Sequence, residues 1–419
     1  MAVRPNIHII FLYAKSPRLR IFVVMKYIYS ASSLPNTRID VADILRGIAI
    51  AGIVLLHFIE HLNFYAFPEP TRLDQAVWDS AFFIFGGKMY AIFALLFGLS
   101  FFIQNDNQAK KGVDFRPRFL WRMLLLFAWG MLDLCFYNGD ILTVYAVCAL
   151  FVIPFIRSSN AVLIAIAAVM FIQPVELVCI IRGLINPDAA PLGFSGSGEH
   201  YMAMYKACAE GGFLDVAGAG VTHGFISNFQ WAIANGRLTQ TVCLFTIGIL
   251  LGRTRLFYDE GDNLKIWKRI LIGAVVMFAL VNPWAGGWAK NVGSECIANA
   301  LTAMQTMWRN FAMMWIIVSG VCLLYYRTRA RKALTVLAPY GKMSLSNYLG
   351  QSIIGSLLFY NWGFGLYTVS GHTMSICIGL LVVILQVCFC HLWLRHHKRG
   401  PFETVWNKLT WIQPFRKNA

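Results

Sequence analysis

The chain has 419 residues, of which 58% are hydrophobic and only 13% are charged, and its formal net charge is +16. Soluble globular chains typically carry about 25% charged residues, so this chain has too few to cover its surface in water. The composition also excludes a disordered chain, a collagen-like repeat and a disulfide-rich secreted scaffold. It indicates a polytopic membrane protein whose main partner is the lipid bilayer.

Apolar segments near the length needed to cross a hydrocarbon layer, about 20 residues, follow one another along the chain. We expect an all-α transmembrane helix bundle of about 10 spans, placed near 42–60, 77–104, 119–137, 141–156, 161–182, 228–251, 269–288, 296–325, 335–360 and 373–394. The second span contains Gly86 and Gly87, and paired glycines predict a break or kink there.

The basic residues are distributed unevenly between the two sides of this bundle. Most of the 36 Lys and Arg residues fall on the side of the N-terminus, and the opposite side carries only Arg72, Arg182, Lys206, Arg237 and Lys290. The positive-inside rule therefore predicts that both termini are cytoplasmic. The same rule accounts for the net charge, so nucleic-acid binding has no support.

We divide the chain into three parts. Residues 1–37 form a predicted N-terminal cytoplasmic arm, whose first 24 residues are either an over-extended start or a surface arm. Residues 38–411 form a single transmembrane domain, and residues 412–419 form a cytoplasmic tail. A long glycine-rich loop near 183–237 is expected outside the membrane, either as a functional lid or as an interfacial flap. Cys208 is expected to be accessible in that loop.

The cysteines and histidines predict neither disulfides nor a metal site. Most of the ten cysteines fall inside apolar runs and no CxxC pair occurs, so we interpret them as small apolar residues. His57, Glu60 and His61 form an HxxEH pattern, which also occurs in zinc proteases. Without a further ligand this pattern is weak, and no metal ligand is predicted.

Charged residues inside spans are costly and mark candidate sites. Asp43 and Arg46 are three residues apart near the cytoplasmic end of the first span and are expected to pair. Arg46 either anchors that end or faces a cavity, where its guanidinium would bind a phosphate of a cytosolic cofactor. Lys88, in the second span, is the other candidate for cofactor binding.

Three further residues are candidates for catalysis. His57 is either a helix-packing histidine or a general base, since its unperturbed pKa lies near the working pH. Asp133 and Asp140 lie at a similar depth. Asp140 could instead cap a helix, whereas Asp133 needs a partner inside the bundle and could hydrogen-bond His57. Mid-membrane polar residues with a possible role in substrate binding are Arg309, Asn347 and Gln351.

Six segments of the chain occur in an order that resembles a known family. They are RIDVADILRGIAIAGIVLL at 38–56, GKMYAIFALLFGLSF at 87–101, NGDILTVYAVCALFVIPF at 138–155, FTIGILLGR at 245–253, GKMSLSNYLGQSIIGSLLFY at 341–360 and RGPFETVWNKLTW at 399–411. Together they resemble the YeiB-like "domain of unknown function" family of bacterial inner-membrane proteins. That family is similar to transmembrane acyltransferases, which move an acyl group from cytosolic acyl-CoA to an acceptor across the membrane using a histidine within the bundle.

The resemblance implies a multi-pass protein of the inner (plasma) membrane that transfers an acyl group from acyl-CoA to an envelope carbohydrate or lipid, with no tightly bound cofactor. The chain departs from the family pattern twice, with His57 where Asn is expected and Asp133 where His is expected. Two alternatives remain open. The chain could be a transporter or flippase that uses the same polar cavity, or an inert envelope or stress component.

Overall fold

The structure is a computed structural model that describes residues 34–61, 68–193, 197–284 and 292–412, together with 287 and 289. Within these residues the regular secondary structure is entirely helical, which confirms the all-α class. The longer helices are α1 (Asp40–Glu60), α2 (Arg72–Ile84), α3 (Lys88–Ala109), α4 (Arg116–Leu134), α5 (Leu142–Val152), α6 (Asn160–Phe171), α7 (Pro174–Ile185), α8 (Ser197–Glu210), α10 (Phe225–Ala234), α11 (Arg237–Arg253), α12 (Asn263–Val281), α13 (Glu295–Arg327), α16 (Ser344–Phe359), α17 (His372–His396) and α18 (Pro401–Trp411). The shorter α-helices are α9 (Phe213–Ala219), α14 (Arg331–Thr335) and α15 (Ala338–Lys342).

The apolar helices confirm a membrane protein. Four of the described helices are long and apolar enough to cross a bilayer, or up to six if each of two bent helix pairs counts as one span. Those pairs are α6 with α7, bent by 42°, and the segment 213–234 with α11, bent by 74°. The interruption predicted at Gly86 and Gly87 is confirmed, since α2 ends just before it and α3 begins just after it.

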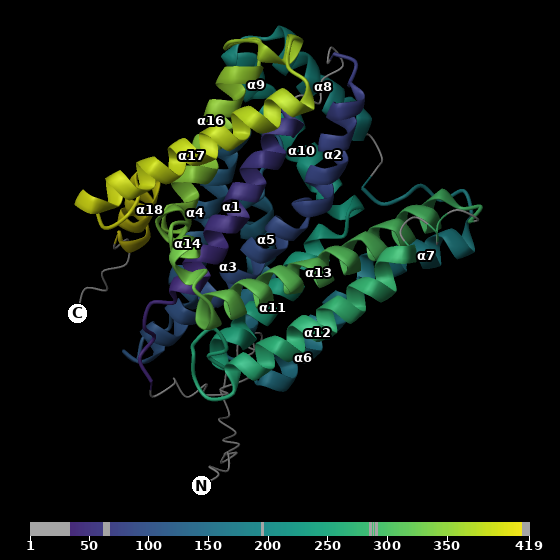
Figure 1. The fold of residues 1–419 in the computed structure, drawn as a ribbon. Coiled ribbons are helices and arrows are strands. Elements are labelled where there is room, and N and C mark those ends of the chain that lie inside the picture. Colours follow the sequence, from purple (N-terminus) through teal and green to yellow (C-terminus); the bar gives the residue numbers. More distant parts are fainter. Residues whose placement is uncertain are drawn as a thin grey trace, which may run out of the picture.

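The bundle is built around α1, which packs against α3, α15, α16 and α17. Beside this central group, α6, α7, α12 and α13 run together as an inclined group (Figure 1). Helices α8, α9 and α10 gather at the end of the bundle where α1 finishes (Figure 1). They occupy most of the region expected as a long outside loop, so much of that region is helical.

Helices α3 and α11 pack closely against each other through small residues. A side chain at Gly98 would collide with the backbone of Phe245, and one at Gly248 would collide with the backbone of Leu95. Small residues at such a contact let two backbones approach closely in a membrane. Tyr90, near the start of α3, is hydrogen-bonded through its hydroxyl to that of Thr241, near the start of α11. The two helices therefore run parallel, with their N-termini side by side.

The accessibility expected for Cys208 is wrong. Cys208 is buried, with 2% of its surface exposed, because α8 packs its thiol against the bundle. Arg237, expected at the end of the outside loop, is the first residue of α11 and is buried inside the protein. The arm predicted for residues 1–37 and the tail predicted for 412–419 lie almost entirely outside the described residues.

The α3–α11 contact yields a stability prediction. Gly98→Leu should destabilise the protein by about 1–3 kcal/mol or more, because overpacking at a backbone contact must push the helices apart. Thermal unfolding of the purified protein measures the effect. Gly320→Ala on α13 is the matched control, because no atom outside its own helix lies near that glycine and alanine favours a helix. Equal melting temperatures for the two variants would show that the α3–α11 contact does not limit stability.

Candidate functional site

Two cavities lie one above the other along α1. The outer cavity, of about 800 Å³, is lined by α1 residues Ile53, Leu56, His57 and Glu60. The inner cavity, of about 430 Å³, is lined by Asp43 and Arg46, near the N-terminus of α1. At a rise of about 1.5 Å per residue, Arg46 and His57 are separated by about 16 Å along the helix axis. One helix therefore presents polar groups to two separate cavities at different depths.

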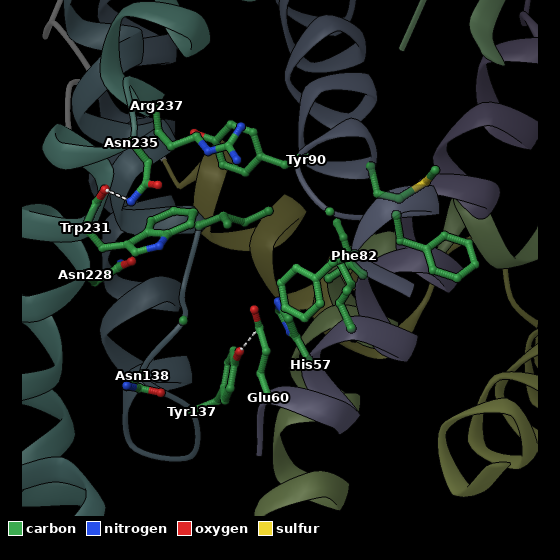
Figure 2. A pocket seen from close by; sticks show the side chains of 18 of the residues that line it. His57, Glu60, Phe82, Tyr90, Tyr137, Asn138, Asn228, Trp231, Asn235 and Arg237 are labelled. Atoms are coloured by element: carbon green, nitrogen blue, oxygen red, sulfur yellow. Dashed lines mark hydrogen bonds between the residues drawn. The ribbon is translucent and has the colours of Figure 1, made fainter. Parts of the chain in front are cut away.

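The outer cavity is closed partly by helices from the region expected as an outside loop. Helix α8 contributes Tyr201, Met204, Tyr205 and Cys208, and α10 contributes Asn228 and Trp231. Figure 2 shows Trp231, Asn228 and Arg237 on one side of this cavity and His57 with Glu60 on another. The region thus forms part of the cavity wall, as a lid would.

His57 is 7% exposed and sits among aromatic rings at the wall of the outer cavity. Its Nδ1 is 2.9 Å from the amide nitrogen of Gln351. The Tyr137 ring lies 4.4 Å from the His57 ring and 4.6 Å from the His61 ring, between centroids. The Tyr137 hydroxyl donates to Glu60 at 2.5 Å. His57 therefore has a fixed orientation, set by Gln351 on one side and Tyr137 on the other.

The direct hydrogen bond considered between Asp133 and His57 is absent, because Gln351 occupies that position. The Gln351 amide nitrogen also lies 2.7 Å from the Ser352 hydroxyl, and the Ser352 side chain also interacts with the Asp133 carboxylate. Asp133 is fully buried, and neither of its oxygens has a well-formed hydrogen bond. Within the described residues, Ser352 and Gln351 link Asp133 to His57.

Asp140 acts structurally at the start of α5. Its carboxylate accepts hydrogen bonds from the backbone N–H groups of Leu142 at 2.9 Å and Thr143 at 2.7 Å. Its backbone carbonyl accepts a hydrogen bond from Asn228 on α10. Neither Asp133 nor Asp140 lines either of these two cavities, so both carboxylates are separated from them by other side chains. Their proposed catalytic roles stay predictions.

The inner cavity is strongly cationic. Its lining includes six basic residues, Arg38, Arg46, Arg122, Lys342, Lys398 and Arg399. The pairing predicted for Asp43 and Arg46 is confirmed, with 2.7 Å between Nη1 and Oδ1, and Asp43 also accepts from Arg38. The second Arg46 amino group donates to Ser100 at 2.7 Å. Because Asp43 and Glu403 are the carboxylates in this lining, the cavity keeps an excess of positive charge.

Helix α18 closes the inner cavity from the C-terminal end of the chain. Glu403 accepts hydrogen bonds from the Ser346 backbone at 2.9 Å and from its hydroxyl at 2.5 Å. Burial raises the pKa of the Glu403 carboxyl, and the bonds from Ser346 act in the opposite direction. The Arg122 guanidinium lies 4.3 Å from the Trp406 ring centroid, a cation–π contact that holds α18 against α4.

Three tyrosines, Tyr90, Tyr145 and Tyr348, separate the two cavities, and we call them the tyrosine layer. Tyr90 lines the outer cavity, whereas Tyr145 and Tyr348 line the inner one. The Tyr145 hydroxyl donates to the Tyr90 carbonyl at 2.7 Å. The Tyr348 ring centroid lies 6.0 Å from that of His57. Tyr348 therefore lies beside His57 and also lines the cationic cavity.

The remaining predicted residues fall in different places. Lys88 and Arg309 line the outer cavity, so Lys88 lies far from the cationic inner cavity expected to hold a cofactor. Asn347 lines neither cavity and donates to the Tyr340 carbonyl. The sequence did not mark Tyr137, Arg237 and Tyr348 as cavity residues, and it offered Glu60 only as part of the HxxEH pattern. Arg237, directly after Gly236 and before an apolar run, could have marked a helix start.

Two protein families match the chain in separate regions. The family described as "Heparan-alpha-glucosaminide N-acetyltransferase, catalytic" matches residues 38–197, and "Protein of unknown function (DUF418)" matches residues 251–413. The first match contains His57, Asp133 and most of the outer-cavity wall. The second contains α13, α16 and α18, and thus Gln351 and much of the inner cavity.

Three bacterial relatives match almost the whole chain. "Uncharacterized protein YxaH" of Bacillus subtilis is 26% identical, over 92% of this chain and 98% of the relative. An "uncharacterized 39.9 kDa protein in amylase 3'region" of Bacillus acidopullulyticus is 24% identical, over 91% and 96%. "Uncharacterized protein YeiB" of Escherichia coli is 25% identical, over 88% and 95%. The relatives and the DUF418 match confirm the resemblance to the YeiB-like family, and the match of residues 38–197 links it to the acyltransferase-like group.

Proposed function

We propose that this chain, which resembles the YeiB-like membrane proteins, transfers an acyl group from a cytosolic acyl-CoA to an envelope carbohydrate or lipid. The observation that carries the proposal is the pair of cavities on α1, one cationic and one containing His57, with the tyrosine layer between them. The likeness of residues 38–197 to a heparan-alpha-glucosaminide N-acetyltransferase catalytic region supports it.

The proposed topology has ten spans in the bacterial inner membrane, with both termini cytoplasmic. Each of the ten apolar segments found in the sequence coincides with one helix or with a group of adjoining helices. Several of these, such as α5 and α16, are shorter than a lone span needs and depend on neighbours that cover them. In this topology the cationic cavity faces the cytoplasm and the lid helices face outward.

Cysteine labelling tests this topology. Asp188, after α7, and Lys111, between α3 and α4, are both exposed and are expected on opposite sides. A membrane-impermeant maleimide applied to cells with a permeabilised outer envelope should label Asp188→Cys but not Lys111→Cys, with the parent chain as the background control. Lysis of the inner membrane should then expose Lys111→Cys. Labelling of both sites before lysis would contradict the topology.

On the donor side, the phosphates of acyl-CoA would bind the cations of the inner cavity. A guanidinium presents several N–H donors that match phosphate oxygens, and Arg46 has its side chain anchored by Asp43 and Ser100. The long pantetheine arm of the donor would cross the tyrosine layer and bring the thioester toward His57. The separation of about 16 Å along α1 suits an extended arm better than a compact ligand.

Substitution of Arg46 tests the donor site. Arg46→Gln should weaken acyl-CoA binding by about tenfold or more, because one charge-assisted phosphate contact is lost. Arg46→Lys should weaken it less. Binding of radiolabelled acyl-CoA to purified protein measures the effect, and Arg327→Gln, at an exposed arginine that ends α13, is the matched control. If Arg46→Gln binds acyl-CoA as tightly as this control, Arg46 only anchors the helix.

On the acceptor side, His57 would act as the general base. A hydroxyl or amine of the acceptor attacks the thioester carbonyl carbon while an imidazole nitrogen takes its proton. When the carbon–sulfur bond breaks, the imidazolium returns that proton to the departing CoA thiolate, so the charges balance. The Gln351 amide would orient the ring. In the structure its nitrogen lies at Nδ1, which places the imidazole proton on Nε2. With the amide flipped, its oxygen would accept a hydrogen bond from Nδ1–H and leave Nε2 as the basic nitrogen.

His57 and Gln351 should therefore behave as one unit. His57→Ala should lower acyl transfer by about 100-fold or more, in the range of general-base catalysis, and Gln351→Ala should lower it less. The double variant should lose little beyond His57→Ala, because residues that act together are non-additive. Acyl transfer by purified protein is the readout, and His391→Ala on α17 is the control. An active His57→Ala protein with intact acyl-CoA binding would remove His57 from the mechanism.

A further inference from the structure

The outer cavity contains three basic residues that the proposed reaction does not use. Lys88, Arg237 and Arg309 all line it, and no ion pair among the described residues includes any of them. The segments outside the described residues contain neither Asp nor Glu, so they supply no missing carboxylate. Lys88 is 1% and Arg237 is 7% exposed. Lys88 donates to the Phe82 carbonyl at 3.1 Å, and Arg309 is partly buried. Buried charges are normally paired with an opposite charge, so this group of cations lacks a counter-ion.

The two carboxylates in the same cavity are engaged elsewhere. Glu60 accepts from the Tyr137 hydroxyl, and Asp79 accepts from Gln75 on its own helix. Figure 2 shows Glu60 with His57 at one end of the cavity and Arg237 with Tyr90 at the other. The cavity is therefore polarised, with a carboxylate and a histidine at one end and a guanidinium at the other.

Two helix N-termini add positive potential at the basic end. Helices α3 and α11 are parallel, and Lys88 and Arg237 are their first residues. Gly87 and Gly236 precede them in the left-handed conformation, and neither helix has a side-chain cap. The positive ends of both helix dipoles thus lie at the cavity. Broken helices in membrane transporters bind anions in the same way, at the N-termini of their half-helices.

Arg237 is held ready for a ligand. Its Nη1 donates to Gln240 at 2.7 Å, and its guanidinium lies 5.5 Å from the ring centroids of both Tyr90 and Trp231. Its Nε is buried and has no hydrogen-bond partner. A Cβ atom at Gly87 would lie only 2.8 Å from an Arg237 amino group, so the absence of a side chain at Gly87 leaves room for the guanidinium. A donor that is fixed, buried and unsatisfied is typical of a site awaiting an acceptor.

We propose that Lys88, Arg237 and Arg309 bind a phosphate group of the acceptor, so that the acceptor is a phosphorylated lipid or glycan. This inference rests on the proposed function in calling the ligand an acceptor, whereas the phosphate site itself does not depend on that function. Three cations and two helix N-termini suit a multiply charged oxyanion better than a single carboxylate. The anchored phosphate would direct the rest of the acceptor toward His57 at the opposite end of the cavity.

Phosphate binding to the purified full chain tests this site. The protein is kept in dodecyl maltoside, a detergent without phosphate, and binding of radiolabelled inorganic phosphate is measured by equilibrium dialysis. Arg237→Gln and Lys88→Gln should each weaken binding by about tenfold or more, because each removes a charge-assisted contact. Arg237→Lys and Lys88→Arg keep the charge and should retain most of it. Arg327→Gln, at the exposed end of α13 and outside both cavities, is the control that should bind phosphate as the parent chain does.

Two lipids then distinguish the source of the phosphate. Phosphatidic acid in mixed micelles should displace inorganic phosphate if a lipid carries the group, whereas diacylglycerol should not. Glycerol phosphate displaces it if a soluble or glycan-borne phosphate is accepted. A parent chain that binds no phosphate, or glutamine variants that bind it unchanged, would overturn the proposal. A parent chain that binds phosphate but not acyl-CoA would instead contradict the proposed acyltransferase function without contradicting the phosphate site.

Discussion

The close parallel packing of α3 and α11 is the constraint on which the rest of the structure depends. Because Gly98 and Gly248 let the two backbones approach, both helices begin at the same depth, beside the outer cavity. Each belongs to an interrupted segment, and the interruptions at Gly87 and Gly236 bring Lys88 and Arg237 into the interior. Irregular backbone within a membrane is tolerated where it lines a cavity, and both breaks do so.

The same packing keeps the two cavities apart. Tyr90 on α3 is bonded to Thr241 on α11 and to Tyr145 on α5, so the α3–α11 pair supports the tyrosine layer. Below it lies a cavity rich in arginine and lysine, and above it lies a cavity with a histidine at one end and cations at the other. Such an arrangement lets two different substrates approach one layer from opposite sides, which a simple pore would not provide.

Composition and periodicity predicted the class of protein, its all-α fold and the break at Gly86 and Gly87, because each depends on local sequence. The Asp43–Arg46 pair was also predictable, since helical spacing alone brings the two side chains together. The partner of His57 was not, because Gln351 is nearly 300 residues away along the chain and only tertiary packing brings it close. Likewise Arg237 was assigned to an outside loop, since hydropathy does not reveal that the chain enters the protein interior at Gly236, where α11 begins.

A structure of the full chain with a non-hydrolysable acyl-CoA analogue tests the central claim most directly. The account predicts that the analogue's phosphates lie among Arg46 and the other cations of the inner cavity, that its arm passes between Tyr145 and Tyr348, and that its acyl carbon lies within reach of His57. An analogue bound wholly on one side of the tyrosine layer, or inside the outer cavity with its phosphates on Arg237, would contradict it.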